Sequence, residues 1–155
     1  MNASDVVSDD MDIELVAFSV AGLKHYLEIT KILEIRRWSA VTALPHAPAE
    51  VLGVMNLRGA VIPIYDLAAR FELGDTKPSE RNVVIVCAVG DKSIGLLVEA
   101  VSEIITVRKD AIQATPDVHS EATRDCIVGV ISIEQEMTRV INIDFVATEK
   151  SVERV

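Results

Sequence analysis

The feature that most constrains the fold of this chain is an internal repeat. Residues 15–24, LVAFSVAGLK, resemble residues 83–92, VVIVCAVGDK, because each apolar run ends in a glycine followed two positions later by a lysine. Three further pairs of segments follow in the same order: 32–35 with 101–104, 52–54 with 128–130, and 61–66 with 140–145. The sequence therefore predicts two similar units that pack together, since each is too small to enclose a generous core alone.

The composition favours strands as the content of both units. Val and Ile dominate the apolar residues, whereas only six residues of the 155 are aromatic, and β-branched side chains pack well on pleated surfaces. Small antiparallel units protect their strand edges by closing into barrels. We therefore expect a mainly β protein built from two small barrels around a shared core.

Changes in composition along the chain set the predicted boundaries. The first residues are acidic and polar, the stretch LGDTKPSER is the clearest loop, and the last residues are again polar. The predicted organisation is a disordered acidic tail over 1–12, a single domain over 13–148 (first barrel unit about 13–73, linker about 73–81, second unit about 82–148), and a C-terminal tail over 149–155.

Local patterns give more detailed expectations for the first half. The stretch APAEVLGVMN, residues 47–56, has a proline start, an early glutamate and helical apolar spacing, which favours a helix. The stretch AVIPIYDL, residues 60–67, reads as a strand that contributes Val61, Ile62 and Ile64 to the core. Asp66 is expected to satisfy a backbone turn at the end of this strand.

Charge and hydropathy exclude several classes of partner. The net charge of −9, with no basic cluster, argues against nucleic acids and against anionic membranes. The N-terminus lacks the basic start and apolar core of a signal peptide, and no apolar run approaches the roughly 18 residues of a membrane span. We expect a cytoplasmic protein that does not insert into the membrane and keeps two buried, reduced thiols, Cys87 and Cys126.

No recognisable catalytic pattern is present in the sequence. His25, His46 and His119 lack partners at catalytic spacing and are each expected on the surface or in a loop. No GxSxG, phosphate-loop, EF-hand or HExxH motif occurs, so we expect neither a catalytic residue nor a metal or cofactor. An enzyme whose site carries no motif stays open as an alternative.

The segment NLRGAVIPIYDLAARF raises the question of what Arg58 does. The second unit carries Ile133-Glu134-Gln135-Glu136 in the corresponding region, so the backbone plan is shared but Arg58 and Gly59 are not. Glu34, in contrast, has a counterpart in Glu103. A half-specific arginine favours a partner-binding role over a solvated turn residue, whereas Glu34 could be structural in both units.

Several of these segments resemble the CheW family of chemotaxis adaptors. The resemblance rests on ILEI at 32–35, TALP at 42–45 and VLGVMNLRGAVIPIYDLAARFEL at 51–73, and covers about residues 13–146. It implies a CheW-like fold of two small five-stranded β-barrels packed around a shared core, with a few short helices. It also implies a non-catalytic bacterial scaffold of two-component signal transduction, which couples transmembrane chemoreceptors to the histidine kinase CheA.

The family likeness implies a receptor-binding groove between the barrels. The cytoplasmic hairpin tip of the receptor would dock there, with Arg58 offering a forked donor and the glycines allowing close backbone approach. The residues carried over to this groove are Ile32, Glu34, Gly53, Val54, Asn56, Leu57, Arg58 and Gly59.

The likeness also implies a kinase-binding surface on the barrel ends, which would face the regulatory domain of CheA. The segment at about 111–119 resembles a contact region in which relatives often carry an arginine and an aromatic residue, but Gln113 and Val118 stand here. Ala68 is a second departure, because many relatives have an arginine after Asp-Leu. Ring assembly and self-association therefore stay open, as does an adaptor role in another chemosensory-type pathway that controls surface motility or a second messenger.

Overall fold

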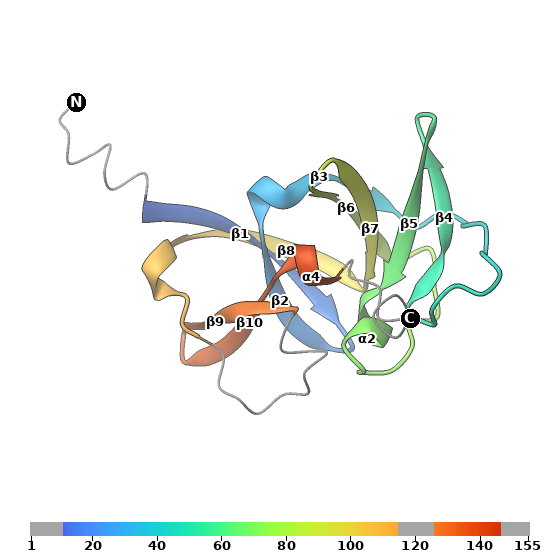
Figure 1. Ribbon diagram of the computed structural model, residues 1–155. Helices are drawn as coiled ribbons and strands as arrows, with labels where there is room; N and C mark the ends of the chain where they lie inside the picture. The colour runs from blue at the N-terminus through green and yellow to red at the C-terminus, as the bar shows by residue number, and fades with distance from the viewer. Residues whose placement is uncertain (1–10, 115–125, 147–155) are drawn as a thin grey trace, which may run out of the picture.

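The computed structural model describes residues 11–114 and 126–146, which form two five-stranded sheets with a few short helical segments (Figure 1). Sheet A has the strand order β8-β1-β2-β10-β9, and sheet B has the order β3-β6-β7-β5-β4. The strands of sheet A are β1 (Asp12–Val20), β2 (Leu23–Glu28), β8 (Ala100–Arg108), β9 (Ile127–Ile133) and β10 (Glu136–Ile141). Those of sheet B are β3 (Ile32–Arg37), β4 (Val51–Leu57), β5 (Ala60–Asp66), β6 (Val83–Val89) and β7 (Lys92–Val98).

The internal repeat is present in the topology, but the two halves exchange strands. Replacing each of β1–β5 by the strand five places later, and the reverse, converts the order of sheet A into that of sheet B. Each sheet takes strands from both halves, because the β1–β2 hairpin pairs with β8 and β10 and the β6–β7 hairpin pairs with β3 and β5. The sequence boundaries at about 13–73 and 82–148 would instead place each half in its own barrel.

Both sheets close through the same kind of crossing. The chain after β3 bridges β4 at Thr42 and Val54, and the chain after β8 bridges β9 at Gln113 and Val130. A Cβ added to Gly53 or Gly129 would lie 2.3 Å from the carbonyl oxygen of Thr42 or Gln113, respectively. These matched glycines therefore let the chain cross at backbone contact distance and close each sheet as a small barrel, barrel A and barrel B.

The β4–β5 hairpin of barrel B and the β9–β10 hairpin of barrel A have the same two-residue turn. Arg58 and Gly59, at φ 52° and 91°, connect the paired residues Leu57 and Ala60. Glu134 and Gln135, at φ 51° and 70°, occupy the same place between β9 and β10. Positive φ at both central residues is the turn geometry that suits the twist of a two-residue hairpin. The predicted equivalence of the two regions is thus confirmed in the backbone.

The predicted helix over 47–56 is wrong, because Val51–Leu57 forms β4. This strand pairs with β5 and buries Met55 and Leu57 inside barrel B, so tertiary pairing overrides the helical apolar spacing. The helical segments named within 11–114 and 126–146 are short: α2 (Leu67–Arg70), α4 (Ile143–Val146), and the 3-10 turns η1 (Ile29–Lys31) and η2 (Lys109–Ala111). No helix within 11–114 or 126–146 is long and apolar enough to cross a bilayer.

Three clusters of buried side chains hold the fold together. The largest lies between the barrels and includes Phe18, Leu67, Phe71 and Ile85, which shows a shared core. Two smaller clusters fill the barrel interiors, one in barrel B and one in barrel A. The expected two-barrel architecture around a common core is therefore confirmed.

α2 and α4 follow β5 and β10 at equivalent places and are joined by an arginine. Asp66 begins α2, and its side chain accepts a hydrogen bond from the Ala68 amide, as predicted for a local backbone turn. Arg70, which is buried, donates from Nε to the Val146 carbonyl at 3.1 Å and from Nη2 to the Phe145 carbonyl at 3.0 Å. A cation at the last carbonyls of a helix is favourable, so Arg70 fixes the two barrels relative to each other.

Candidate functional site

The residues expected in a receptor groove gather at the edge of barrel B. Ile32 and Glu34 lie on β3, and the other six lie on β4 or in the turn that follows it. β3 and β4 are the two outer strands of sheet B, and the crossing of Thr42 over Val54 brings them together. The fold thus places these residues along the line where β3 and β4 meet, which we call the seam of barrel B, although Glu34 and Arg58 are 24 positions apart in the sequence.

An ion-pair network spans this seam. Arg58 donates from Nη2 to Oε2 of Glu34, and Arg36 donates from Nη1 to Oε1 of the same carboxylate at 3.1 Å. The hydrogen bonds from Arg58 and then Arg36 lower the pKa of Glu34, and Glu34 in turn raises the pKa of Arg58. The Arg58 side chain is nevertheless 69% exposed. The guanidinium is therefore held in place by Glu34 while most of it remains available to a partner.

Apolar side chains are exposed on β3 and on β5, the strand that pairs with β4. Leu33 and Ile35 of β3 are 58% and 46% exposed, and Val61 of β5 is 64% exposed. The prediction that Val61 belongs to the core is wrong, because the alternation of β5 buries Ile62 and Ile64 and turns Val61 to the surface beside the hairpin tip. These exposed side chains were missed as site candidates, because ILEIRR and AVIPIYD show no strict alternation of apolar and polar residues that would have indicated which side chains face outward.

Several of the expected groove residues are structural. Gly53 and Leu57 are buried, and the backbone that approaches Gly53 is the chain's own at Thr42. Ile32 packs partly against the core between the barrels. Asn56 is exposed, and its Oδ1 accepts a hydrogen bond from the Gly59 amide at 3.0 Å, which fixes the turn. The surface that a partner can reach therefore centres on Asn56, Arg58 and Gly59, with Val54 partly exposed beside them.

The equivalent seam of barrel A has the opposite character. Glu103, the counterpart of Glu34, pairs with Lys24 of β2 at 3.4 Å. Glu134 of the hairpin tip and Glu136 of β10 line the same hollow of about 270 Å³. Both seams thus contain a glutamate at the equivalent position, but an exposed arginine at the hairpin tip occurs only in barrel B. Glu34 and Glu103 each anchor a cation, which agrees with a structural role in both units.

Of the two expected kinase-binding residues, Gln113 lies among the described residues. Gln113 has an exposed side chain, while its backbone exchanges two hydrogen bonds of 2.8 Å with Val130 in the crossing that closes barrel A. Val118 lies outside the described residues. Ala68, noted as a departure from the family pattern, is buried within α2.

The prediction that His25 is a surface or loop residue is wrong. His25 lies on β2, is fully buried, and packs between Phe18 and Phe71 with ring centroids 5.7 and 5.6 Å away. Its Nε2 lies 2.9 Å from Nη2 of Arg139, and burial, followed by the charge of Arg139, lowers the pKa of His25 to about 4. The ring is a neutral member of the inter-barrel core, and its place inside an alternating strand was the available clue.

The two cysteines and the other two histidines were the remaining candidates for chemistry. Cys87 and Cys126 are both buried, as predicted, and burial raises the pKa of the Cys87 thiol to about 12. His46 is exposed in a loop with φ 66°, which confirms that prediction, and His119 lies outside the described residues. Within 11–114 and 126–146, no three His, Cys, Asp or Glu side chains are arranged to hold a metal ion.

The fold and the seam define a paired-barrel protein whose chemistry is suited to holding other proteins. Comparison with known proteins agrees: residues 14–151 match the family described as CheW-like domain. The chain is 46% identical over 133 residues to chemotaxis protein CheW of Rhizobium meliloti, with 86% of each chain covered. It is 43% identical over 142 residues to "Probable chemotaxis protein CheW" of Rhizobium etli, with 92% of each covered.

A solved structure shows the same architecture. The chain aligns with the scaffolding protein TtCheW of Thermoanaerobacter tengcongensis with a TM-score of 0.82, 28% identity and 90% of each chain covered. This chain therefore belongs to the CheW family of chemotaxis proteins, and it is a scaffold-type protein and not an enzyme.

Proposed function

We propose that this protein is a chemotaxis adaptor that couples the cytoplasmic tips of transmembrane chemoreceptors, the methyl-accepting chemotaxis proteins, to the histidine kinase CheA. The observation that carries the proposal is the seam of barrel B. It presents an exposed guanidinium held by Glu34, together with exposed apolar side chains on β3 and β5. Barrel A exposes apolar side chains at equivalent positions, Ile104 and Met137, but has Glu134 in place of the arginine at its hairpin tip.

The receptor side of the proposal follows from the chemistry of the seam. A receptor tip is a helical hairpin in this family, and an amphipathic helix binds by laying apolar side chains against an apolar surface. Leu33, Ile35 and Val61 offer such a surface. Arg58 can form a forked hydrogen bond to a carboxylate or carbonyl at the rim, which would set the register of the helix. The binding residues would be these four together with Asn56 and Gly59.

The kinase side rests on the family likeness. The regulatory domain of CheA is expected to have the same paired-barrel fold and to contact a barrel end, with Gln113 and Val118 in the contact segment. Recruitment through both partners would bring the protein from the cytoplasm to receptor arrays. Closure of adaptor–kinase rings or self-association would depend on the same surface.

A second candidate is an adaptor for a different chemosensory-type pathway, for surface motility or second-messenger control. The chain is also 26% identical over 131 residues to Protein FrzA of Myxococcus xanthus. The two candidates share the fold and the seam and differ in the partners. Co-purification from native cytosol, followed by identification of the bound kinase and receptor, separates them.

The direct test is a pair of titrations with the full chain. We expect one-to-one binding of an isolated CheA regulatory domain, and binding of a receptor cytoplasmic fragment that contains the hairpin tip. Calorimetry gives both affinities. Absence of heat and of any change in sedimentation with both partners at high micromolar concentration would contradict the adaptor function.

A further inference from the structure

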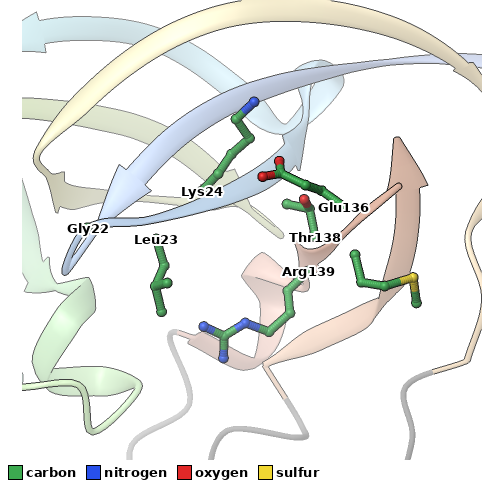
Figure 2. A pocket seen from close by; sticks show the side chains of 7 residues that line it. Gly22, Leu23, Lys24, Glu136, Thr138 and Arg139 are labelled. Carbon is green, nitrogen blue, oxygen red and sulfur yellow. The ribbon is translucent and has the colours of Figure 1, made fainter. Parts of the chain in front are cut away.

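A second surface of interest is a hollow of about 560 Å³ between the starts of β2 and β10 in barrel A (Figure 2). The β1–β2 turn that borders it lies beside α2, whereas the β4–β5 hairpin projects away at another side of the molecule (Figure 1). The pairing of β2 with β10 involves only His25 with Arg139 and Tyr26 with Val140. The two strands therefore separate toward their starts and leave the hollow between them.

Arg139 lies at the base of the hollow and is held in a fixed orientation. Its Nη2 lies 2.9 Å from Nε2 of His25, and its guanidinium carbon is 5.9 Å from the centre of the Phe71 ring. The Nδ1 of His25 lies 3.0 Å from the Leu23 carbonyl, so Nδ1 donates to that carbonyl and Nε2 accepts from Arg139. The position of the guanidinium is thus determined before any partner binds.

Arg139 is a half-buried cation that forms no ion pair with a carboxylate of the described residues. Among residues 11–114 and 126–146, no ion pair involves Arg139, whereas the nearby Lys24 pairs with Glu103. Burial lowers the pKa of Arg139. A partly desolvated guanidinium gains most from a charged acceptor that can take two of its hydrogen bonds. The base of the hollow is therefore complementary to a carboxylate.

The lining of the hollow is mixed, and two of its side chains are apolar and exposed. Leu23 and Met137 line it and are 49% and 60% exposed. Figure 2 shows the tips of Leu23 and Arg139 directed toward each other, while Lys24 and Glu136 extend to the other side of the hollow. An apolar side chain next to a carboxylate would therefore meet Leu23 and Met137 as the carboxylate reaches Arg139.

The backbone plan does not require this arrangement. Tyr26 pairs with Val140 in barrel A where Gly95 pairs with Ile64 in barrel B. Counting one residue back on each strand puts Ile94 and Pro63 at the places of His25 and Arg139. Barrel B thus closes with two apolar residues at this position, and the buried histidine and arginine are additions specific to barrel A.

We propose that this hollow docks an extended acidic segment of a partner protein. The carboxylate of an Asp or Glu side chain binds the Arg139 guanidinium, and a neighbouring apolar side chain packs between Leu23 and Met137. The surface is separate from the receptor seam of barrel B, so the inference stands whether or not the proposed coupling of receptor and kinase is correct.

The test uses the isotope-labelled full chain and two blocked peptides, acetyl-Ala-Leu-Glu-Leu-Ala-amide and the same peptide with Gln in place of Glu. Nuclear magnetic resonance follows the Nε–H signal of Arg139 and the amide signals of Leu23 and Met137. We expect saturable shifts with the Glu peptide, a dissociation constant on the order of millimolar, and about tenfold weaker binding of the Gln peptide.

Two variants make the result specific to the hollow. The double variant Leu23→Ser/Met137→Ser removes the apolar walls and should weaken binding of the Glu peptide at least fivefold, on the order of the loss of two exposed apolar contacts. Ile104→Ser is the matched control, because Ile104 of barrel A is a similarly exposed apolar residue that does not line the hollow. It should leave the affinity unchanged.

Three outcomes would overturn the proposal. Equal binding of the Glu and Gln peptides would show that the carboxylate charge does not contribute to binding. Absence of shifts, or shifts at the β4–β5 hairpin instead, would remove the site. A change in the sedimentation coefficient of the chain alone in the Leu23→Ser/Met137→Ser variant would show that a second copy covers this surface.

Discussion

The two barrels repeat one backbone plan, and they differ in what that plan presents to a partner. Both have a glutamate at the same place on the strand that begins the seam, Glu34 in barrel B and Glu103 in barrel A, and both have a two-residue hairpin turn. In barrel B the hairpin supplies the cation, Arg58, whereas in barrel A it supplies Glu134 and the cation comes from Lys24. The strand pairing and the chain crossings are therefore shared by both barrels, while the exposed arginine at the hairpin tip is present in one copy only, and the proposed function assigns receptor recognition to that copy.

The inter-barrel core shows a second difference of the same kind. Barrel A contributes His25 and Arg139 where barrel B has Ile94 and Pro63. The polar pair costs burial free energy that two apolar residues do not, and its hydrogen bonds to each other and to the Leu23 carbonyl offset part of that cost.

The largest predicted effect concerns the backbone crossings that both barrels share. Gly53→Ala places a Cβ 2.3 Å from the Thr42 carbonyl oxygen at φ 155°, so we expect a loss of about 3 kcal/mol or more in the free energy of unfolding. Gly129→Ala meets the same crowding at Gln113 and should also be costly. Gly59→Ala is the control, because nothing lies within 4 Å of its added Cβ, and it should cost only about 1 kcal/mol. Urea unfolding measures the free energy of unfolding of all three variants. An equal loss in Gly53→Ala, Gly129→Ala and Gly59→Ala would contradict the close backbone crossing at Gly53 and Gly129.

The next effect tests the polar core of barrel A. Because the pKa of His25 is about 4 when folded and 6.5 in an unperturbed chain, the unfolded state takes up the proton first as the pH falls. The stabilisation is complete above pH 6.5 and is lost between pH 6.5 and 4, with about 2 kcal/mol gone by pH 5. Chemical denaturation at pH 7.5 and pH 5 measures this loss. His25→Ile, which introduces the residue found at this place in barrel B, should reduce the dependence of the unfolding free energy on pH. An unchanged dependence on pH would contradict the lowered pKa of His25.

A smaller effect concerns the apolar part of the receptor seam. Leu33→Ser combined with Ile35→Ser should weaken binding of a receptor fragment about tenfold, because two exposed apolar side chains no longer contact the receptor helix. Ile104→Ser is the matched control, because Ile104 is the exposed counterpart of Ile35 in barrel A. Fluorescence anisotropy with a labelled fragment gives the affinities, and equal weakening by the control would mean that the seam of barrel B is not special.

The smallest expected effect is at the ion pair of barrel A. Lys24→Gln removes an exposed pair, and such pairs contribute between about 0 and 1 kcal/mol. We expect receptor affinity within about twofold of the unchanged chain and a thermal midpoint shifted by about 2 °C or less. A large loss of receptor binding would show that both seams take part in recognition.

The sequence predicted the repeat, the paired barrels and the buried thiols, because these depend on local pattern and on the order of matched segments. It did not predict the exchange of strands between the halves. That exchange depends on which hairpin pairs with which strand across the molecule, and β2 with β10 or β5 with β7 leaves no local trace in the sequence.

Individual side chains were harder to assign than segments. Val61 lies in an apolar run, and only its place in the alternation, next to the hairpin tip, exposes it. His25 was assigned to the surface from its residue type, whereas Phe18, Phe71 and Arg139 from three other elements enclose it. Gly53 was carried over as a groove residue, and the approach it allows is that of the chain itself. In each case a contact distant in sequence decides the role.

The central claim is that recognition of the receptor resides in the hairpin tip of barrel B and not in the shared plan. Its most direct test is calorimetric titration of a receptor cytoplasmic fragment into Arg58→Glu and into Glu134→Arg, the charge reversals at equivalent turn positions. We predict at least tenfold weaker binding for Arg58→Glu, unchanged binding for Glu134→Arg, and free energies of unfolding within about 0.5 kcal/mol of the unchanged chain for both. Normal receptor affinity of a folded Arg58→Glu variant would contradict the account.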